Sequence, residues 1–132
     1  MKLIIGGCCQ GKLQYVYRTS GLLQDAVLYG VENKYKTDEI QIPVEGTWIW
    51  NDFQDWFQKM LEERKDPETT ADQLLIDHSN IIIICDEIGN GIVPLSIEER
   101  LYRERLGKYL CSLAERAESV ERILCGLSQK LK

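Results

Sequence analysis

The residues best placed for chemistry lie near the N-terminus, in the segment GGCCQGKL (6–13). Gly6, Gly11 and Lys12 keep the spacing of a phosphate-binding loop, in which four residues separate two glycines and a lysine follows the second. The backbone N–H groups of such a loop surround a phosphate, the following helix contributes its dipole, and the lysine contributes a charge. The usual next residue is Ser or Thr, whose hydroxyl ligates Mg²⁺, but here it is Leu13.

We therefore predict that this loop binds a nucleotide phosphate; a glycine turn with an exposed lysine is the alternative. The candidate binding residues are Gly6, Gly7, Cys8, Cys9, Gln10, Gly11, Lys12 and Leu13. Because leucine cannot ligate a metal, Mg²⁺ would have to be held by nucleotide phosphates, waters and a carboxylate elsewhere in the chain.

A second candidate is the acidic pair Asp86 and Glu87, which directly follows the apolar run IIIIC (81–85). A carboxylate at such a strand end could ligate magnesium or orient a nucleophile. Ligands of open parallel sheets bind at the carboxyl ends of the strands, so this pair and the glycine loop could share one crevice. The candidate catalytic residues are thus Lys12, Asp86 and Glu87, with Asp86 as the candidate metal ligand. The pattern equally allows an acidic pair that ends a buried strand and faces water.

The elements that must position these residues alternate between strands and helices. Apolar, β-branched runs predict strands at 2–6, 26–31, 40–44, 80–87 and 122–127. Helical spacing predicts helices at 11–21, at 48–64 behind a Thr47 cap, at 71–78, and from Ile97 onward. This alternation predicts an α/β fold with a mostly parallel sheet.

Capping boxes support two of these helices. Thr70 with Gln73 predicts the start of the short one, and Ser96 with Glu99 predicts the start of the longest one. The apolar stripe expected to bury the longest helix is Ile97, Leu101, Leu106, Leu110, Leu113 and Ala117.

Composition limits the class of protein. The chain has 132 residues and a net charge of −5, without a Lys/Arg cluster, so we expect one domain over 1–132 that binds no nucleic acid. Five cysteines, an odd number without a CxxC pair, argue against a disulfide framework or a zinc site. The N-terminus shows no signal-peptide cleavage region, and no apolar run is long enough to cross a bilayer. We therefore expect a cytoplasmic protein.

The segment DEIGNGIVP (86–94) and the helix after it, together with the glycine loop, resemble the adenosylcobinamide kinase/adenosylcobinamide-phosphate guanylyltransferase family. That family carries an N-E-V-G-x-G-I-V-P segment, a following helix with an R-x-x-x-G-R-x-x-Q-x-L-A pattern, and a phosphate loop after its first strand. The residues that fall in register here are Glu87, Gly89, Gly91, Ile92, Val93, Pro94, Gly107, Leu113, Ala114, Gly126 and Lys132.

The resemblance implies a RecA-like P-loop fold and a role in cobalamin biosynthesis. Members use ATP or GTP to phosphorylate the aminopropanol arm of cobinamide, and then transfer GMP from GTP to that phosphate through a guanylylated histidine. The implied cofactors are GTP or ATP, as substrate, and Mg²⁺. The implied partners are the nucleotide and a cobinamide-like corrinoid, and the implied assembly is a homotrimer.

Three positions depart from the family pattern. Leu13 replaces the metal-binding hydroxyl, and the best match to the family's L-D-C-L-T-L-W-L segment, 50–57, places Asn51 where the magnesium-binding Asp belongs, with Asp52 adjacent. The covalent histidine of the family follows its second strand, where this chain has none. The single histidine, His78, ends a predicted helix, where a surface or capping role is the ordinary one.

Three hypotheses follow for function. The first is a cobinamide kinase, with guanylyl transfer as its less supported half. The second is a nucleotide-binding regulatory or assembly subunit without catalysis, which Leu13, Asn51 and the missing histidine favour. The third is an unrelated small P-loop kinase. The three tryptophans could stack on a base or a corrin, but structural roles explain them better: Trp56 fits the core stripe, and Trp48 and Trp50 could flank a subunit contact or a strand end.

Overall fold

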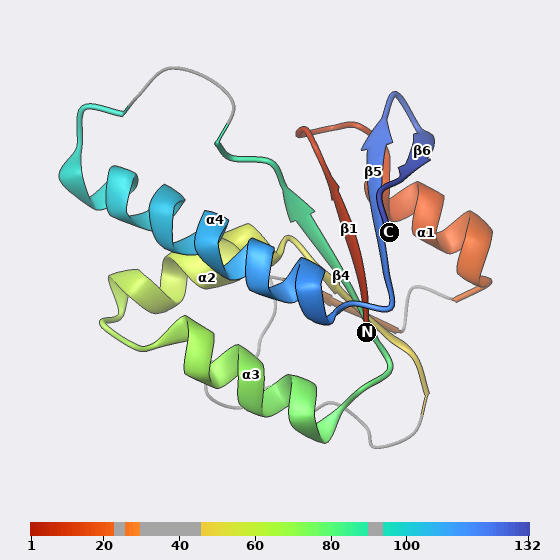
Figure 1. Ribbon diagram of the computed structural model, residues 1–132, viewed down its shortest axis with the longest axis horizontal. Helices are drawn as coiled ribbons and strands as arrows, with labels where there is room; N and C mark the ends of the chain where they lie inside the picture. The colour runs from red at the N-terminus through yellow and green to blue at the C-terminus, as the bar shows by residue number, and fades with distance from the viewer. Residues whose placement is uncertain (23–25, 30–45, 90–93) are drawn as a thin grey trace.

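The structure is a computed structural model that describes residues 1–22, 26–29, 46–89 and 94–132 (Figure 1). The elements are β1 (Lys2–Gly6), α1 (Lys12–Ser20), β2 (Val27–Tyr29), β3 (Trp48–Asn51), α2 (Phe53–Glu62), α3 (Pro67–Asp77), β4 (Ile81–Asp86), α4 (Ile97–Arg116), β5 (Ser119–Leu124) and β6 (Leu127–Lys130). The predicted strand at 40–44 lies outside the described residues, as do residues 30, 31 and 90–93 of other predicted segments.

The strands form one sheet in the order β2-β3-β4-β1-β5-β6. All neighbouring pairs are parallel except β5 and β6, which are antiparallel. Helices α2, α3 and α4 lie on one face of the sheet and α1 lies on the other (Figure 1). The predicted α/β class is therefore confirmed. Among the described residues, no helix is long and apolar enough to cross a membrane.

The four consecutive isoleucines of β4 supply both faces of the core, because side chains alternate along a strand. Ile81 and Ile83 join the cluster under α2 and α4, while Ile82 and Ile84 join the cluster under α1. All four are at least 94% shielded from solvent, with exposed fractions of 6% or less. The prediction of a strand buried on both faces is confirmed.

The predicted helix over 48–64 is wrong in its first part. Residues Trp48–Asn51 form β3, whose Ile49 and Trp50 are fully buried on opposite faces of the sheet. Asp52 then adopts a left-handed conformation, with φ at 54°, and helix α2 begins at Phe53. Thr47 therefore caps no helix. Aromatic residues occur on both sides of the boundary between β3 and α2, so the sequence pattern resembles that of a single helix.

The two capping boxes predicted from the sequence have different outcomes in α3 and α4. Helix α3 begins at Pro67 behind Asp66, so the predicted Thr70 cap is wrong; the Thr70 hydroxyl instead donates to the Asp66 carbonyl at 2.8 Å from within the helix. Helix α4 begins as predicted, because Ser96 Oγ accepts a hydrogen bond from the Glu99 N–H.

The predicted stripe of α4 is wrong at its N-terminal end. Ile97 and Leu101 are 63% and 54% exposed. The residues of α4 that are buried are Tyr102, Leu106, Tyr109 and Leu113. The first turn of α4 therefore stands away from the sheet, and two tyrosines carry the contact that aliphatic residues were expected to make.

The last predicted strand, 122–127, is wrong in its bounds. The chain turns at Cys125 and Gly126, which both have positive φ, and returns as β6 antiparallel to β5. Positive φ at both central residues is the conformation of a type I′ hairpin turn. All four residues of β6 are exposed.

Candidate nucleotide site at the carboxyl edge of the sheet

The glycine loop connects the end of β1 to the start of α1. A side chain at Gly6 would place its Cβ 2.4 Å from the Ile123 carbonyl oxygen of β5, so this glycine is required by the sheet itself. Gly11, with φ at 80°, precedes the helix and has no side chain with which to cap it. The first N–H groups of α1 therefore have no side-chain cap, and they lie at the positive end of the helix dipole. An anion-binding site needs both features.

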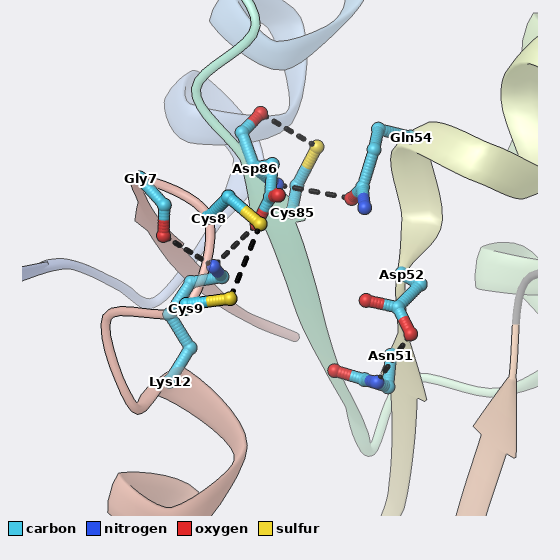
Figure 2. Close-up of polar contacts among 9 residues, drawn as sticks. All are labelled: Gly7, Cys8, Cys9, Lys12, Asn51, Asp52, Gln54, Cys85 and Asp86. Carbon is cyan, nitrogen blue, oxygen red and sulfur yellow. Dashed lines mark hydrogen bonds and ion pairs between the residues drawn. The ribbon is translucent and has the colours of Figure 1, made fainter.

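Lys12 is the buried cation of this loop, with 7% of its surface exposed. Its Nζ donates to the Gly7 carbonyl at 2.8 Å and forms an ion pair with the Asp86 carboxylate at the end of β4 (Figure 2). The loop and the strand end thus meet at the carboxyl edge of the sheet. A buried ammonium needs such partners because an unpaired charge is costly to desolvate.

A cavity of about 210 Å³ lies at this meeting point. Its lining consists of residues 8–14, Asn51, Asp52 and Asp86. It therefore lies at the ends of β3, β4 and β1. These three strands are neighbours in the sheet, although β1 is distant from the other two in the sequence. A crevice at the carboxyl ends of parallel strands is where ligands of open α/β sheets bind.

Asn51 and Asp52 enter the site from the end of β3, across the space from the glycine loop (Figure 2). Asn51 Nδ2 donates to Asp52 Oδ2 at 2.8 Å, so the amide holds the carboxylate in place. Asp52 is adjacent to Asn51 in the sequence, but the helix predicted over 48–64 gives it no position at a strand end. The signal that identifies Asp52 is its place directly after the buried strand β3.

Gln54 is a further residue that the sequence did not reveal. It is buried, its Oε1 accepts a hydrogen bond from the Asp86 N–H at 3.0 Å, and its carbonyl accepts one from the Tyr102 hydroxyl at 2.9 Å. Through these bonds α2 and α4 fix the end of β4, and so the position of the Asp86 backbone.

Carboxylates outnumber cations at this edge. Burial raises the pKa of Asp55, with smaller contributions from the negative charges of Asp52 and Asp86. The pKa of Cys8 is raised by its hydrogen bond with Cys9 and by the charge of Asp86, against a weaker opposing effect of Lys12. Two carboxylates, Asp52 and Asp86, line the cavity beside the Lys12 ammonium, and such a set suits a cation that is bound together with phosphates.

Glu87 lies apart from its neighbour Asp86. Its carboxylate forms an ion pair with Arg122 at 2.7 Å, and its N–H donates to the Gly6 carbonyl at 2.9 Å. It lines a different cavity of about 320 Å³, which is mainly apolar and lies beside α4. Glu87 follows the last residue of β4, and its side chain turns to the opposite side from that of Asp86, so of the predicted acidic pair Asp86 is the one that reaches Lys12.

Leu13 is half-buried and packs against the aliphatic cluster under α1. This packing gives a physical reason for a leucine where a hydroxyl is usual.

His78 follows the last residue of α3 and precedes β4, so it lies toward the amino ends of the strands, away from the cavity. Trp50 and Trp56 are fully buried in the aromatic core, where neither can stack on a base.

A family model described as cobinamide kinase / cobinamide phosphate guanyltransferase matches residues 23–131. The chain belongs to this family. The resemblance seen in the sequence and the predicted P-loop fold are thereby confirmed. No curated protein matches the chain. The matched range contains Asn51, Asp52 and Asp86, whereas the glycine loop precedes it, so the loop rests on its own spacing and geometry.

Proposed function

We propose that this protein acts in cobalamin biosynthesis, binding ATP or GTP in the cavity at the carboxyl edge and transferring its terminal phosphoryl group to adenosylcobinamide. Membership of the cobinamide kinase / guanyltransferase family supports the pathway and the substrates. The observation that carries the kinase assignment is the meeting of Lys12 with Asp86 inside a cavity lined by the glycine loop.

In this proposal Lys12 exchanges partners when nucleotide binds. In the structure its ammonium forms an ion pair with Asp86 and donates a hydrogen bond to the Gly7 carbonyl. Phosphate oxygens would replace Asp86 at Lys12, while loop N–H groups and the start of α1 hold the phosphate chain. Lys12 would then stabilise the negative charge that develops on the transferred group.

The residues present fit Mg²⁺ held jointly with a nucleotide. No group of three or more His, Cys, Asp or Glu side chains among the described residues could hold a metal alone. Mg²⁺ commonly takes one or two carboxylates together with substrate phosphates, and Asp86 and Asp52 are the carboxylates on this cavity. The metal would neutralise phosphate charge; Leu13 contributes no ligand.

The alternative within the family is a nucleotide-binding regulatory or assembly subunit. Leu13, packed in the aliphatic core, and Asn51, in the position of an acid, are the observations that favour it. Guanylyl transfer is the less supported half of the activity, because His78 lies away from the cavity. We further propose a cytoplasmic location, which five unpaired cysteines support, and a homotrimer on the family resemblance alone.

The test is to incubate the purified protein with cobinamide, Mg²⁺ and either ATP or GTP, and to weigh the corrinoid by mass spectrometry. A gain of phosphate supports the kinase, and a further gain of GMP supports transfer as well. Nucleotide binding with an unchanged corrinoid supports the regulatory alternative.

Nucleotide affinity is compared in parallel between Lys12→Ala and Lys108→Ala. Lys108 pairs with Glu104 on the exposed surface of α4, away from the cavity, so its variant is the matched control. We expect Lys12→Ala to weaken binding roughly a hundredfold, the effect of losing a charged contact with phosphate, and Lys108→Ala to leave it unchanged. Equal affinities in the two variants would remove the basis for the loop as the nucleotide site.

A further inference from the structure

Two adjacent cysteines, Cys8 and Cys9, lie within the glycine loop, in a position that phosphate binding does not require. Both are exposed, and their Sγ atoms lie 3.5 Å apart (Figure 2). Both line the cavity that holds Lys12 and Asp86. Neither has the ordinary packing role of a free cysteine, which Cys85 shows by being fully buried in the core.

We propose that Cys8 and Cys9 form a redox-modified dithiol site, which a low-molecular-weight disulfide converts to a vicinal disulfide that weakens phosphate binding. The modification itself depends only on the two thiols. Its effect on nucleotide affinity rests on the proposed function of the loop.

The reaction is two thiol–disulfide exchanges. One cysteine thiolate attacks a sulfur of the small disulfide, whose S–S bond breaks and releases one thiol, leaving a mixed disulfide on the protein. The second cysteine thiolate then attacks the protein sulfur of that mixed disulfide and releases the second thiol. Two electrons pass from the cysteines to the small disulfide, and the two protons of the cysteine thiols end on the two released thiols.

The bridge cannot form without moving the loop backbone. Consecutive Cα atoms are about 3.8 Å apart, below the range of about 4.4–6.8 Å that disulfides usually span, and the sulfurs must approach to about 2.05 Å. Cys9 already has a left-handed backbone, with φ at 58°. The same backbone carries the Gly7 carbonyl that holds Lys12, so a bridge displaces the groups that would surround a phosphate. A strained bridge is also more easily reduced, which makes the modification reversible.

The charges around the pair set the rate of the reaction. Asp86 at the end of β4 and Asp52, the residue between β3 and α2, line the cavity together with the Lys12 ammonium at the start of α1. The hydrogen bond with Cys9 and the charge of Asp86 raise the pKa of Cys8, so its thiol keeps its proton in neutral solution. Because the thiolate is the nucleophile, we expect oxidation to accelerate as pH rises and to be slow at neutrality.

The test uses the full chain carrying Cys111→Ser and Cys125→Ser, which removes the other two exposed thiols. Cys85 stays as an internal reference, because burial raises its pKa and keeps it unreactive. After treatment with oxidised glutathione, we expect the protein to lose two thiols and the mass of two hydrogen atoms, without retained glutathione. Trypsin then releases peptide 3–12, in which the bridge is located by its mass with and without dithiothreitol.

Nucleotide affinity is measured before oxidation, after it, and after reduction with dithiothreitol. We expect oxidation to weaken binding roughly tenfold or more and reduction to restore it. In Cys8→Ser on the same background, glutathione adds to the remaining thiol and no bridge forms. Stable mixed disulfides in the parent protein, or a bridge that leaves affinity unchanged, would overturn the proposal.

A reduced protein that binds no nucleotide would count against the proposed function instead. In that case peptide 3–12 decides the modification site: a bridged peptide supports it, and an unbridged one overturns it. Mapping the same peptide in the unsubstituted chain checks that the serine replacements did not alter the loop.

Discussion

The two faces of the central sheet are packed by different kinds of residue. Under α2, α3 and α4 the core is aromatic, with Trp50 in edge contact with Phe53 and Trp56 at centroid distances of 4.9 and 4.7 Å. Under α1 the core is aliphatic and is built mainly from isoleucines of β1, β3, β4 and β5. One face is thus covered by three helices and large rings, and the other by a single helix of nine residues.

The difference between the two faces extends to the carboxyl edge of the sheet, where the carboxylates of two consecutive residues turn to opposite faces. Asp86 turns to the α1 face and pairs with Lys12, whereas Glu87 turns to the other face and pairs with Arg122. The Lys12–Asp86 pair of the candidate nucleotide site therefore lies at the end of the aliphatic layer, on the α1 face. The aromatic layer packs against the opposite face of the same sheet. We infer that the aromatic face supplies most of the stability and that the α1 face can be adjusted for binding at lower cost.

The largest expected effect tests the aromatic face. Trp50→Ala removes a fully buried indole, and we expect the free energy of unfolding to fall by about 3–5 kcal/mol, because the surrounding rings collapse only partly into the cavity. Ile49→Val, at the adjacent residue on the α1 face, should cost about 0.5–1.5 kcal/mol. Urea unfolding of the two variants measures both. A loss from Trp50→Ala no larger than that from Ile49→Val, which removes far fewer atoms, would contradict the inference that the aromatic face supplies most of the stability.

The next prediction compares the neighbouring carboxylates. Asp86→Asn leaves the Lys12 ammonium, which is 7% exposed, beside a neutral group, and we expect a loss of about 1–3 kcal/mol. This is less than for a fully buried pair, because Asp86 itself is 19% exposed. Glu87→Gln should cost about 0–1 kcal/mol, since Arg122 is 43% exposed and water can replace its partner. Urea unfolding at neutral pH distinguishes them. A larger loss from Glu87→Gln would place the critical ion pair on the other face.

The elements that could be predicted from the sequence are those whose signal is local. β1 and β4 are short apolar runs, α1 is terminated by Gly21, which has a positive φ, and α4 begins directly after its Ser96 cap. β6 could not be predicted, because all its side chains are exposed and no hydrophobic pattern marks it. β3 was missed because the apolar spacing of Trp48–Asn51 continues into α2, and only the backbone at Asp52 separates them.

The part of the site that could be predicted is the part whose residues lie at the ends of strands recognisable in the sequence. The parallel-sheet rule places the glycine loop and Asp86 at one edge, and the structure brings Lys12 and Asp86 into contact there. Asp52 and Gln54 required the correct boundary between β3 and α2, so the sequence did not identify them. The separation of Asp86 from Glu87 follows from the alternation of side-chain direction at the end of β4, which turns neighbouring residues to opposite faces.

The smallest expected effect concerns how α1 is attached to its face. Glu121 of β5 accepts hydrogen bonds from the Tyr15 hydroxyl of α1 at 2.6 Å and from the Ser128 hydroxyl of β6 at 2.5 Å. These bonds lower the pKa of Glu121 below its usual 4.5, the bond from Ser128 contributing most. A carboxyl whose pKa is lowered by folding stabilises the protein above its unfolded pKa, and that stability is lost as pH falls through the folded value.

We therefore expect Glu121→Gln to lower the free energy of unfolding by about 1 kcal/mol at neutral pH and by progressively less as pH falls from about 5 toward 3. The check is the urea midpoint of both proteins across that range, with Glu115→Gln, at an exposed position of α4, as the control that should follow the unsubstituted curve. A constant difference between the Glu121→Gln and unsubstituted curves would show that the charge of Glu121 does not matter. The attachment of α1 would then depend on its aliphatic packing and on its other polar contacts, such as the ion pair of Lys12 with Asp86, rather than on the charge of Glu121.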